Sequence, residues 1–225
     1  DKVYWETDIG RGRPSWNIQD PAMITESLGY SIDISCGGID NLYRHHDYNI
    51  AVIEAVSGEE FARYWVHGEH LLVDGKKMSK SVGNILYPED LLKDGFGPQY
   101  LRFYLLYGHH RKALNLTPKH LQEASRKVDL LNAMVTRLLA GDADMKGKPS
   151  GPEDGEVDAA IDRLIPDFER HMNDDLNVKG AFDAVFEDLS ALSSLKESGR
   201  VSSAAARRVE EKLRTMDAVF QFLMR

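Results

Sequence analysis

The chain has 225 residues, of which 42% are hydrophobic and 28% charged, so it is long enough for one large or two modest domains with real cores. Its formal net charge of -8 excludes a polycationic protein, and a nucleic-acid partner would have to use a local patch. The single cysteine, Cys36, excludes an intramolecular disulfide and a multi-cysteine metal cage. No apolar run approaches the roughly 20 residues of a membrane span, and we see no signal peptide. We therefore expect a cytoplasmic protein without a membrane partner, and, because the first residue is Asp, a piece of a longer one.

The first elements are predicted from turn residues and hydrophobic spacing. Residues 1–15 are rich in glycine and predict an irregular segment with one short extended piece at most. Residues 16–28 have helical spacing, with Asp20-Pro21 as the expected start. Residues 30–35 alternate with a period of two, which predicts a strand that ends in a tight turn at Gly37-Gly38.

A glycine turn between that strand and a helix expected over residues 40–55 is typical of nucleotide sites in open α/β sheets. Gly37 and Gly38 would let the backbone approach ATP, and Asp40 could accept hydrogen bonds from a ribose or an amine. Taken alone, the same residues are as compatible with a plain turn and a helix N-cap as they are with a nucleotide site. Cys36, beside the turn, is predicted to be a buried structural thiol.

The next strand is expected over residues 61–67, followed by a short extended return over residues 70–74. A loop rich in lysine and serine, residues 75–84, comes directly after it. We predict that this loop leaves the edge of the same α/β unit and that it is mobile without a ligand, because glycines flank it and little of it is apolar.

The order Lys-Met-Ser-Lys-Ser in this loop predicts a clamp for ATP phosphates. Lys77 and Lys80 are point charges that would act catalytically by stabilising charge developing in nucleotidyl chemistry. Ser79 and Ser81 supply small hydroxyl groups for ATP binding. The alternative is a basic surface turn, but the ordered string is far more specific than its composition.

Helices dominate the rest of the chain. A helix is expected from Pro88, and an apolar helical run over residues 100–108. Leucine, alanine and valine then recur at spacings of three and four from Leu121 to Leu138, which predicts an amphipathic helix. After a linker rich in glycine and proline, three further helices complete an antiparallel bundle. The linker is expected over residues 141–155, and the helices over 157–172, 178–195 and 202–223.

Several segments together resemble cysteinyl-tRNA synthetase, a class I aminoacyl-tRNA synthetase, and the related cysteine ligase of mycothiol synthesis. They occur in the order and spacing of that family: Gly12 to Ile18, Gly37 to Asp40, His45-His46, Lys77 to Asn84 and Met172 to Asn177. The resemblance implies the second half of a Rossmann-like catalytic domain over residues 1–97, a connector over 98–117 and an antiparallel bundle of the tRNA-binding type over 118–225. It also implies that the first half of the catalytic domain, with a His-Ile-Gly-His type motif, lies outside this chain.

The resemblance further implies an amino-acid pocket at Trp16, Asp20, His45 and Asn49. In the family, a cysteine, a histidine and a glutamate at the last three positions help to hold a zinc ion for the substrate thiolate. Only His45 is unchanged here; Asp20 could ligate through oxygen, and Asn49 is a poor zinc ligand. We therefore predict no tightly bound zinc.

Two hypotheses remain open. The first is a catalytic piece of a ligase that uses ATP with Mg²⁺ to activate an amino acid and transfers it to tRNA or another acceptor, incomplete without its first half, which would be part of the same polypeptide or a separate partner. The second is a non-catalytic paralogue that binds nucleotide or tRNA. The intact lysine loop favours the first, and the altered pocket favours the second.

Overall fold

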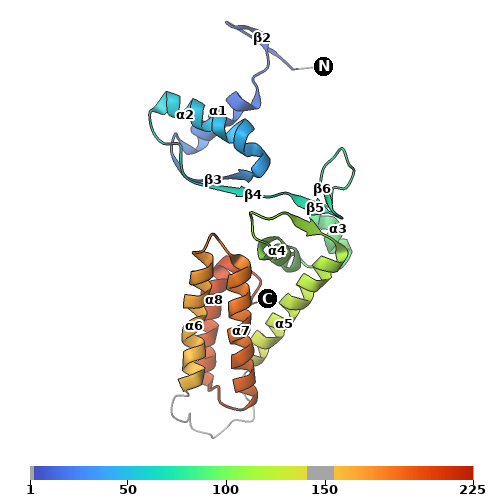
Figure 1. The fold of residues 1–225 in the computed structure, drawn as a ribbon, viewed down its shortest axis with the longest axis vertical. Helices are drawn as coiled ribbons and strands as arrows, with labels where there is room; N and C mark the ends of the chain where they lie inside the picture. The colour runs from blue at the N-terminus through green and yellow to red at the C-terminus, as the bar shows by residue number, and fades with distance from the viewer. Residues whose placement is uncertain (1–2, 141–154, 225) are drawn as a thin grey trace. The chain divides into compact units, whose positions relative to one another are not determined.

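The computed structural model describes residues 3–140 and 155–224 (Figure 1). The chain divides into two compact units, Asp1–His70 and Leu71–Arg225, which we describe separately. All but the last residue of the expected linker at 141–155 lies outside the described residues. Among the residues that are described, none of the helices is both long and apolar enough to cross a membrane.

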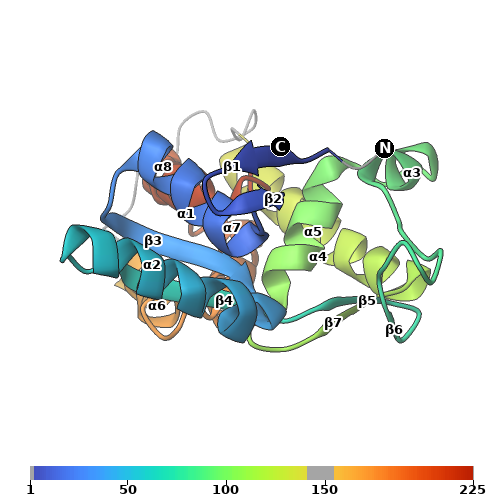
Figure 2. The same ribbon diagram turned by 90° about the horizontal axis from the view of Figure 1, so that it is seen from above.

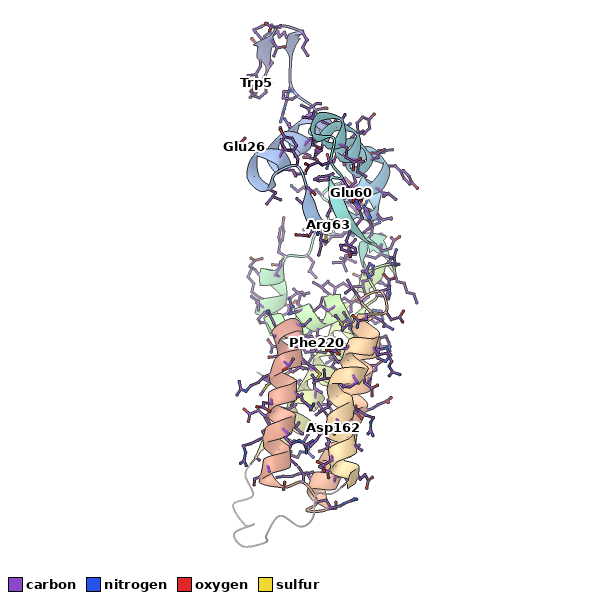
Figure 3. All side chains as sticks on the ribbon, turned by 90° about the vertical axis from the view of Figure 1, so that its left-hand side faces the viewer. Trp5, Glu26, Glu60, Arg63, Asp162 and Phe220 are labelled. Carbon is purple, nitrogen blue, oxygen red and sulfur yellow. The ribbon has the colours of Figure 1, made fainter. Side chains whose placement is uncertain are left out.

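The first unit begins with a hairpin of β1 (Trp5–Thr7) and β2 (Gly10–Gly12). The prediction of one extended piece at most was therefore wrong. The Thr7 hydroxyl donates to the Gly10 carbonyl at 2.7 Å, and Gly10 takes a φ of 117°, which only glycine adopts readily. Asp8 and Ile9 form the turn of the hairpin, and Gly10 and Gly12 are the first and last residues of β2. Trp5 lies on this hairpin, away from the helices of its unit (Figure 3).

Helix α1 (Trp16–Leu28) occupies the predicted range but does not start at Asp20-Pro21. Its first turn is closed at Ser15, whose carbonyl accepts the backbone N–H groups of Ile18 and Gln19 at 3.0 Å. Pro21 lies inside the helix, close enough to the N-terminus that its missing N–H costs only one early hydrogen bond.

Two further strands of the first unit pair in parallel, close to the ranges 30–35 and 61–67 in which strands were predicted: β3 (Ile32–Gly38) and β4 (Ala62–Gly68). Gly37 and Gly38 are the last ladder residues of β3, opposite His67 and Gly68, so the prediction of a turn at these glycines was wrong. The chain turns back only after Gly38.

The helical segment after β3 is compound, whereas one helix was predicted over residues 40–55. A 3₁₀ turn (Ile39–Asn41) leads into a π-helical turn (Leu42–His46) and then into α2 (Asp47–Ser57). π-helical turns are rare and are frequent at functional sites, because the wider turn redirects side chains. Here the redirected residues include His45 and His46.

Helices α1 and α2 cover the same face of the β3–β4 pair (Figures 1 and 2). Ile53, Phe61 and Ala62 form the small core on that side. Ile34 and Tyr64, which are opposite each other in the ladder, are 58% and 67% exposed. The other face of this sheet is therefore apolar and uncovered within its unit.

The second unit contains a small mixed sheet in the order β6-β5-β7, with helices α3 and α4 nearby. Its strand β7 was not predicted. The lysine loop contains β6 and so belongs to this sheet and not to the β3–β4 pair, and the prediction that the loop leaves the edge of the first α/β unit was wrong. The bounds are β5 (Leu71–Val73), β6 (Lys76–Lys77), α3 (Pro88–Lys93), α4 (Pro98–Tyr107) and β7 (Leu114–Leu116).

Long helices complete the second unit, and the predicted helical C-terminal part is confirmed. They are α5 (Pro118–Leu139), α6 (Gly155–Met172), α7 (Val178–Glu197) and α8 (Ser203–Phe220). Their apolar stripes form one continuous core, in which Phe220 is fully buried (Figure 3). The division of the chain at residues 97 and 117 stays a prediction.

Candidate functional site

The end of strand β3 packs directly against the π-helical turn. An added Cβ at Gly37 would lie 2.5 Å from Cε1 of His46, so only glycine allows this imidazole to rest on the strand. Nδ1 of His46 is 2.8 Å from Nε2 of His67 on β4. Burial is the main cause that lowers the pKa of His46, assisted by the neighbouring His67 and His45 and opposed by Asp20 and Asp47. His46 is therefore a neutral imidazole near pH 7.

Beside this imidazole, helix α1 and the turns before α2 border an open cavity of about 270 Å³. It is lined by Trp16, Asp20, Asn41, His45 and His46. Three of the four predicted pocket residues thus gather at one cavity, whereas Asn49 is buried one helical turn beyond His45. Asn41 and His46 were not predicted as pocket residues.

Asp40, a predicted ATP ligand, lies in the 3₁₀ turn after β3 and is exposed. Its carboxylate is 3.3 Å from Nε2 of His70. A Cβ at Gly38 would lie 2.7 Å from a carboxylate oxygen of Asp40, but this is the end of an exposed side chain that can move aside. Only Gly37 therefore has a firm steric role, against the buried His46 ring, and the sequence prediction did not include it.

The lysine loop of the second unit has defined internal geometry. The turn between β5 and β6 places Asp74 and Gly75 at φ values of 49° and 76°, and the Gly75 N–H donates to the Asn115 side chain on β7 at 2.7 Å. Lys77 ends β6 and Lys80 begins the following turn, and both are exposed.

Asn84 closes this loop. Its side-chain oxygen accepts the Ser79 N–H at 2.9 Å, and its amide group donates to the Lys77 carbonyl at 3.2 Å. The Ser79 hydroxyl lies 3.2 Å from the Ser81 hydroxyl and also accepts the Val82 N–H. Asn84 was quoted in the motif, but its structural role was not predicted. The mobility of the loop without ligand stays a prediction.

Cys36 is exposed, so the prediction of a buried structural thiol was wrong. It belongs to β3, on the same face of the strand as the exposed Ile34. Cys36 would be buried if the sheet were covered on both faces, but the face on which it lies is uncovered in this unit.

A second polar cluster joins the segment after α4 to the turn between α6 and α7. His109, His110 and Asp175 offer ligand atoms within 4.8 Å of one another and are the one such group of three among residues 3–140 and 155–224. However, Arg111 donates to both oxygens of the Asp175 carboxylate. Nδ1 of His109 accepts the Arg111 N–H, so Nε2 carries the proton and faces the carboxylate. This arrangement is that of an ion-pair cluster, because a metal would need Nε2 unprotonated.

Comparisons with known proteins agree with the two parts of this architecture. Residues 1–126 match the family model of the class I (C) tRNA synthetase catalytic domain, and residues 167–224 match the DALR domain. The chain is 39% identical to the cysteine--tRNA ligase of Chlamydia pneumoniae, over 98% of this chain and 46% of that protein. The ligase of Protochlamydia amoebophila is 35% identical, over 99% of this chain and 45% of its own length. The chain thus spans about half the length of these relatives.

Solved structures show the same fold at lower identity. A LeuRS of Agrobacterium radiobacter K84, solved as a ternary complex with tRNA and LeuAMS, has a TM-score of 0.59 at 20% identity, covering 85% of this chain and 26% of its own. A putative arginyl-tRNA synthetase of Campylobacter jejuni has a TM-score of 0.61 at 13% identity, covering 97% of this chain and 54% of its own.

The family models and the relatives therefore place the chain among the tRNA synthetases of class I. Within that class, the chain belongs to the family of the class I (C) tRNA synthetase catalytic domain, followed by a DALR domain. The resemblance on which the sequence analysis relied is confirmed.

The family's zinc does not fit the residues that replace its ligands. Asp20 and His45 line the cavity together, but a third strong ligand is missing, because the Asn49 amide is a weak donor to zinc. Within the part of the chain that the structure describes, the only grouping of three His, Cys, Asp or Glu ligands lies in the second unit.

Proposed function

We propose that this chain supplies the second part of a ligase that uses ATP with Mg²⁺ to activate an amino acid as its adenylate and passes it to tRNA or another acceptor. The observation that carries the proposal is the folded Lys77–Ser81 loop, in which Asn84 and the paired serines hold the backbone while both lysines remain at the surface. Lys80, with Lys77, would stabilise charge on the phosphates during adenylate formation.

The glycine-ended strand β3 would provide the second set of nucleotide contacts. Gly37 and Gly38 lie at the carboxyl end of a parallel strand, the edge at which open α/β sheets bind ligands. Asp40 follows directly in the 3₁₀ turn, where a carboxylate suits a ribose hydroxyl or an amino group. Ser79 and Ser81 would contribute hydroxyl groups from the lysine loop.

The β3–β4 pair supports the need for a further α/β segment. Parallel sheets are normally buried on both faces, and two strands alone are marginally stable. Here one face carries the exposed pair Ile34 and Tyr64. We propose that the first half of the nucleotide-binding domain covers this face, as part of the same polypeptide or as a separate one.

The remaining assignments complete the proposal. Residues 1–97 would form the second half of the catalytic domain, residues 98–117 the connector and residues 118–225 the bundle that contacts tRNA. We place the reaction in the cytoplasm, where ATP and tRNA are available.

Exchange of pyrophosphate into ATP, dependent on an amino acid, tests this function. We expect no exchange by this chain alone, because in-line attack on the α-phosphate requires groups from both halves of the domain. Exchange should appear when the chain is joined to a first half bearing the His-Ile-Gly-His type motif. Exchange by the isolated chain would refute the assignment of roles, and its absence from the joined protein with all amino acids would refute the function.

A further inference from the structure

The cavity between α1 and the π-helical turn contains an uncompensated carboxylate. Asp20 is partly buried in its wall, and no hydrogen bond or ion pair links it to another residue in the described part of the chain. Its neighbour His46 cannot neutralise it, because burial lowers the pKa of that imidazole and leaves the ring uncharged near pH 7. The wall therefore has a negative charge without a matching cation.

One further polar atom of the cavity wall lacks a partner. Nδ1 of His45 is buried and has no hydrogen-bond partner among the described residues, and it is an acceptor when the ring proton is on Nε2. Asn49, one turn further along, is buried with its Oδ1 atom unpaired among the described residues, but it does not line the cavity. A buried acceptor left unsatisfied costs free energy, so a ligand that brings a donor to Nδ1 would be stabilised here.

The chemistry of these two groups selects the ligand. An ammonium group has three donors, no acceptor and a positive charge, so it complements a carboxylate and an imidazole nitrogen. A cysteine side chain without zinc is a neutral thiol with one weak donor, so it brings no charge to pair with Asp20, and the zinc that would hold its thiolate lacks strong ligands among the described residues. The volume of about 270 Å³ suits a short side chain.

We propose that this cavity binds the ammonium group of a small cationic amino-acid side chain, so that the amino acid activated is not cysteine. This inference rests on the proposed function and names its substrate class. Asp20 would be the main determinant of specificity, with Nδ1 of His45 as a second acceptor.

A series of amino acids of similar shape tests the proposal in the complete protein, in which this chain is joined to its first half. L-2,4-diaminobutyrate, L-homoserine and L-norvaline differ only in the end group of the side chain, and L-cysteine serves as the family reference. All share the α-ammonium group, so differences between them report the side chain. We expect kcat/KM for pyrophosphate exchange to be about 100-fold higher for L-2,4-diaminobutyrate than for L-norvaline.

A matched pair of variants locates the effect. Asp20→Asn should lower kcat/KM for L-2,4-diaminobutyrate by about 10- to 100-fold and leave L-norvaline nearly unchanged. Asp47→Asn removes an exposed carboxylate that also acts on His46 but does not line the cavity. It should leave kcat/KM unchanged for both L-2,4-diaminobutyrate and L-norvaline. Cysteine as the preferred substrate, one zinc per protein by elemental analysis, or equal effects of the two variants would overturn the proposal.

Calorimetric binding separates this inference from the function on which it rests. If no amino acid supports exchange, the proposed ligase fails. Binding of L-2,4-diaminobutyrate that Asp20→Asn abolishes would still support the cavity assignment in that case. If L-2,4-diaminobutyrate does not bind, the cavity assignment is refuted whatever the exchange assay shows.

Discussion

Arg111 holds the Asp175 carboxylate through two parallel hydrogen bonds, from Nε at 2.5 Å and from a terminal nitrogen at 3.0 Å. This pair joins the segment after α4 to the turn between α6 and α7. Asp175 and Leu176 both adopt positive φ values, of 53° and 54°, which cost free energy for residues other than glycine. The two-pronged ion pair helps to hold that strained turn.

The first prediction concerns the pH dependence of this pair. The Arg111 hydrogen bond lowers the pKa of Asp175 below its ordinary value. Because the pKa is lower in the folded state, the stabilisation is present above the unfolded pKa and is lost as pH falls through the folded one. Arg111→Gln should move the Asp175 midpoint upward in a carboxyl-carbon NMR titration. Arg214→Gln, which breaks an exposed pair with Glu210 on α8, should leave it unchanged.

The second prediction tests the contact between β3 and the π-helical turn. Gly37→Ala should lower the free energy of unfolding of the first unit by about 1–3 kcal/mol, because the new Cβ would overlap the buried His46 ring. Gly68→Ala is the control, since nothing lies within 4 Å of its added Cβ. Urea unfolding followed by tryptophan fluorescence measures both. Equal losses would show that backbone freedom, and not the His46 contact, requires glycine.

The third prediction separates binding from catalysis in the lysine loop. In the protein joined to its first half, Lys80→Ala should slow adenylate formation about 100-fold and weaken ATP binding by less than about threefold, because the charge acts chiefly in the transition state. Pre-steady-state adenylate formation and equilibrium ATP binding give the two values. Lys76 is an exposed lysine just before the motif, and Lys76→Ala should have little effect on the rate of adenylate formation or on ATP binding. Equal losses in rate and binding would contradict the role of Lys80.

The fourth prediction concerns Asp188, which lies 7% exposed on α7. Burial raises the pKa of its carboxyl group, although Arg163 on α6 opposes this with two hydrogen bonds to Oδ1. A folded pKa above the unfolded one means that the stabilisation is present below the unfolded pKa and is lost as pH rises through the folded value.

Thermal unfolding at several pH values tests the direction of this pH dependence of stability. The stability of the native protein relative to Asp188→Asn should fall as pH rises from about 4 to 7. Asp162→Asn, an exposed carboxylate paired with Arg208, provides a control in which burial plays no part. A difference for Asp188→Asn that does not change with pH would refute the assigned pKa shift.

The helices were predictable because the spacing of their apolar residues is a local pattern in the sequence. Leu121, Val128 and Leu138 recur at helical spacing on α5, and all three are fully or nearly fully buried. The strand β3 was predictable for the same reason, since alternation over residues 30–35 has a period of two. The three residues of β7 show no period, and β7 pairs with β5 far away in the sequence, so only tertiary structure reveals it.

The sequence predicted the candidate site as a set of residues, three of which line one cavity, but it did not predict the geometry. The motif identified Gly37 and His45, whereas the pairing of His46 with His67 depends on the parallel register, which places Gly37 opposite His67. No local pattern encodes that register. The role of Asn84 had a signal, because it ends the quoted motif, and amide side chains commonly close loops by bonding to backbone groups.

Arg102 connects the end of helix α8 to helix α4. From α4 it donates to the carbonyls of Phe220 and Val219, at 2.7 and 2.9 Å, where helix α8 ends. Phe222, just beyond, packs edge-on against Phe103, the neighbour of Arg102. A force applied to the C-terminal residues, in an optical trap or by a translocating protease, would therefore load α4 as soon as α8 begins to unravel, so mechanical unfolding of α8 and of α4 should occur as one event.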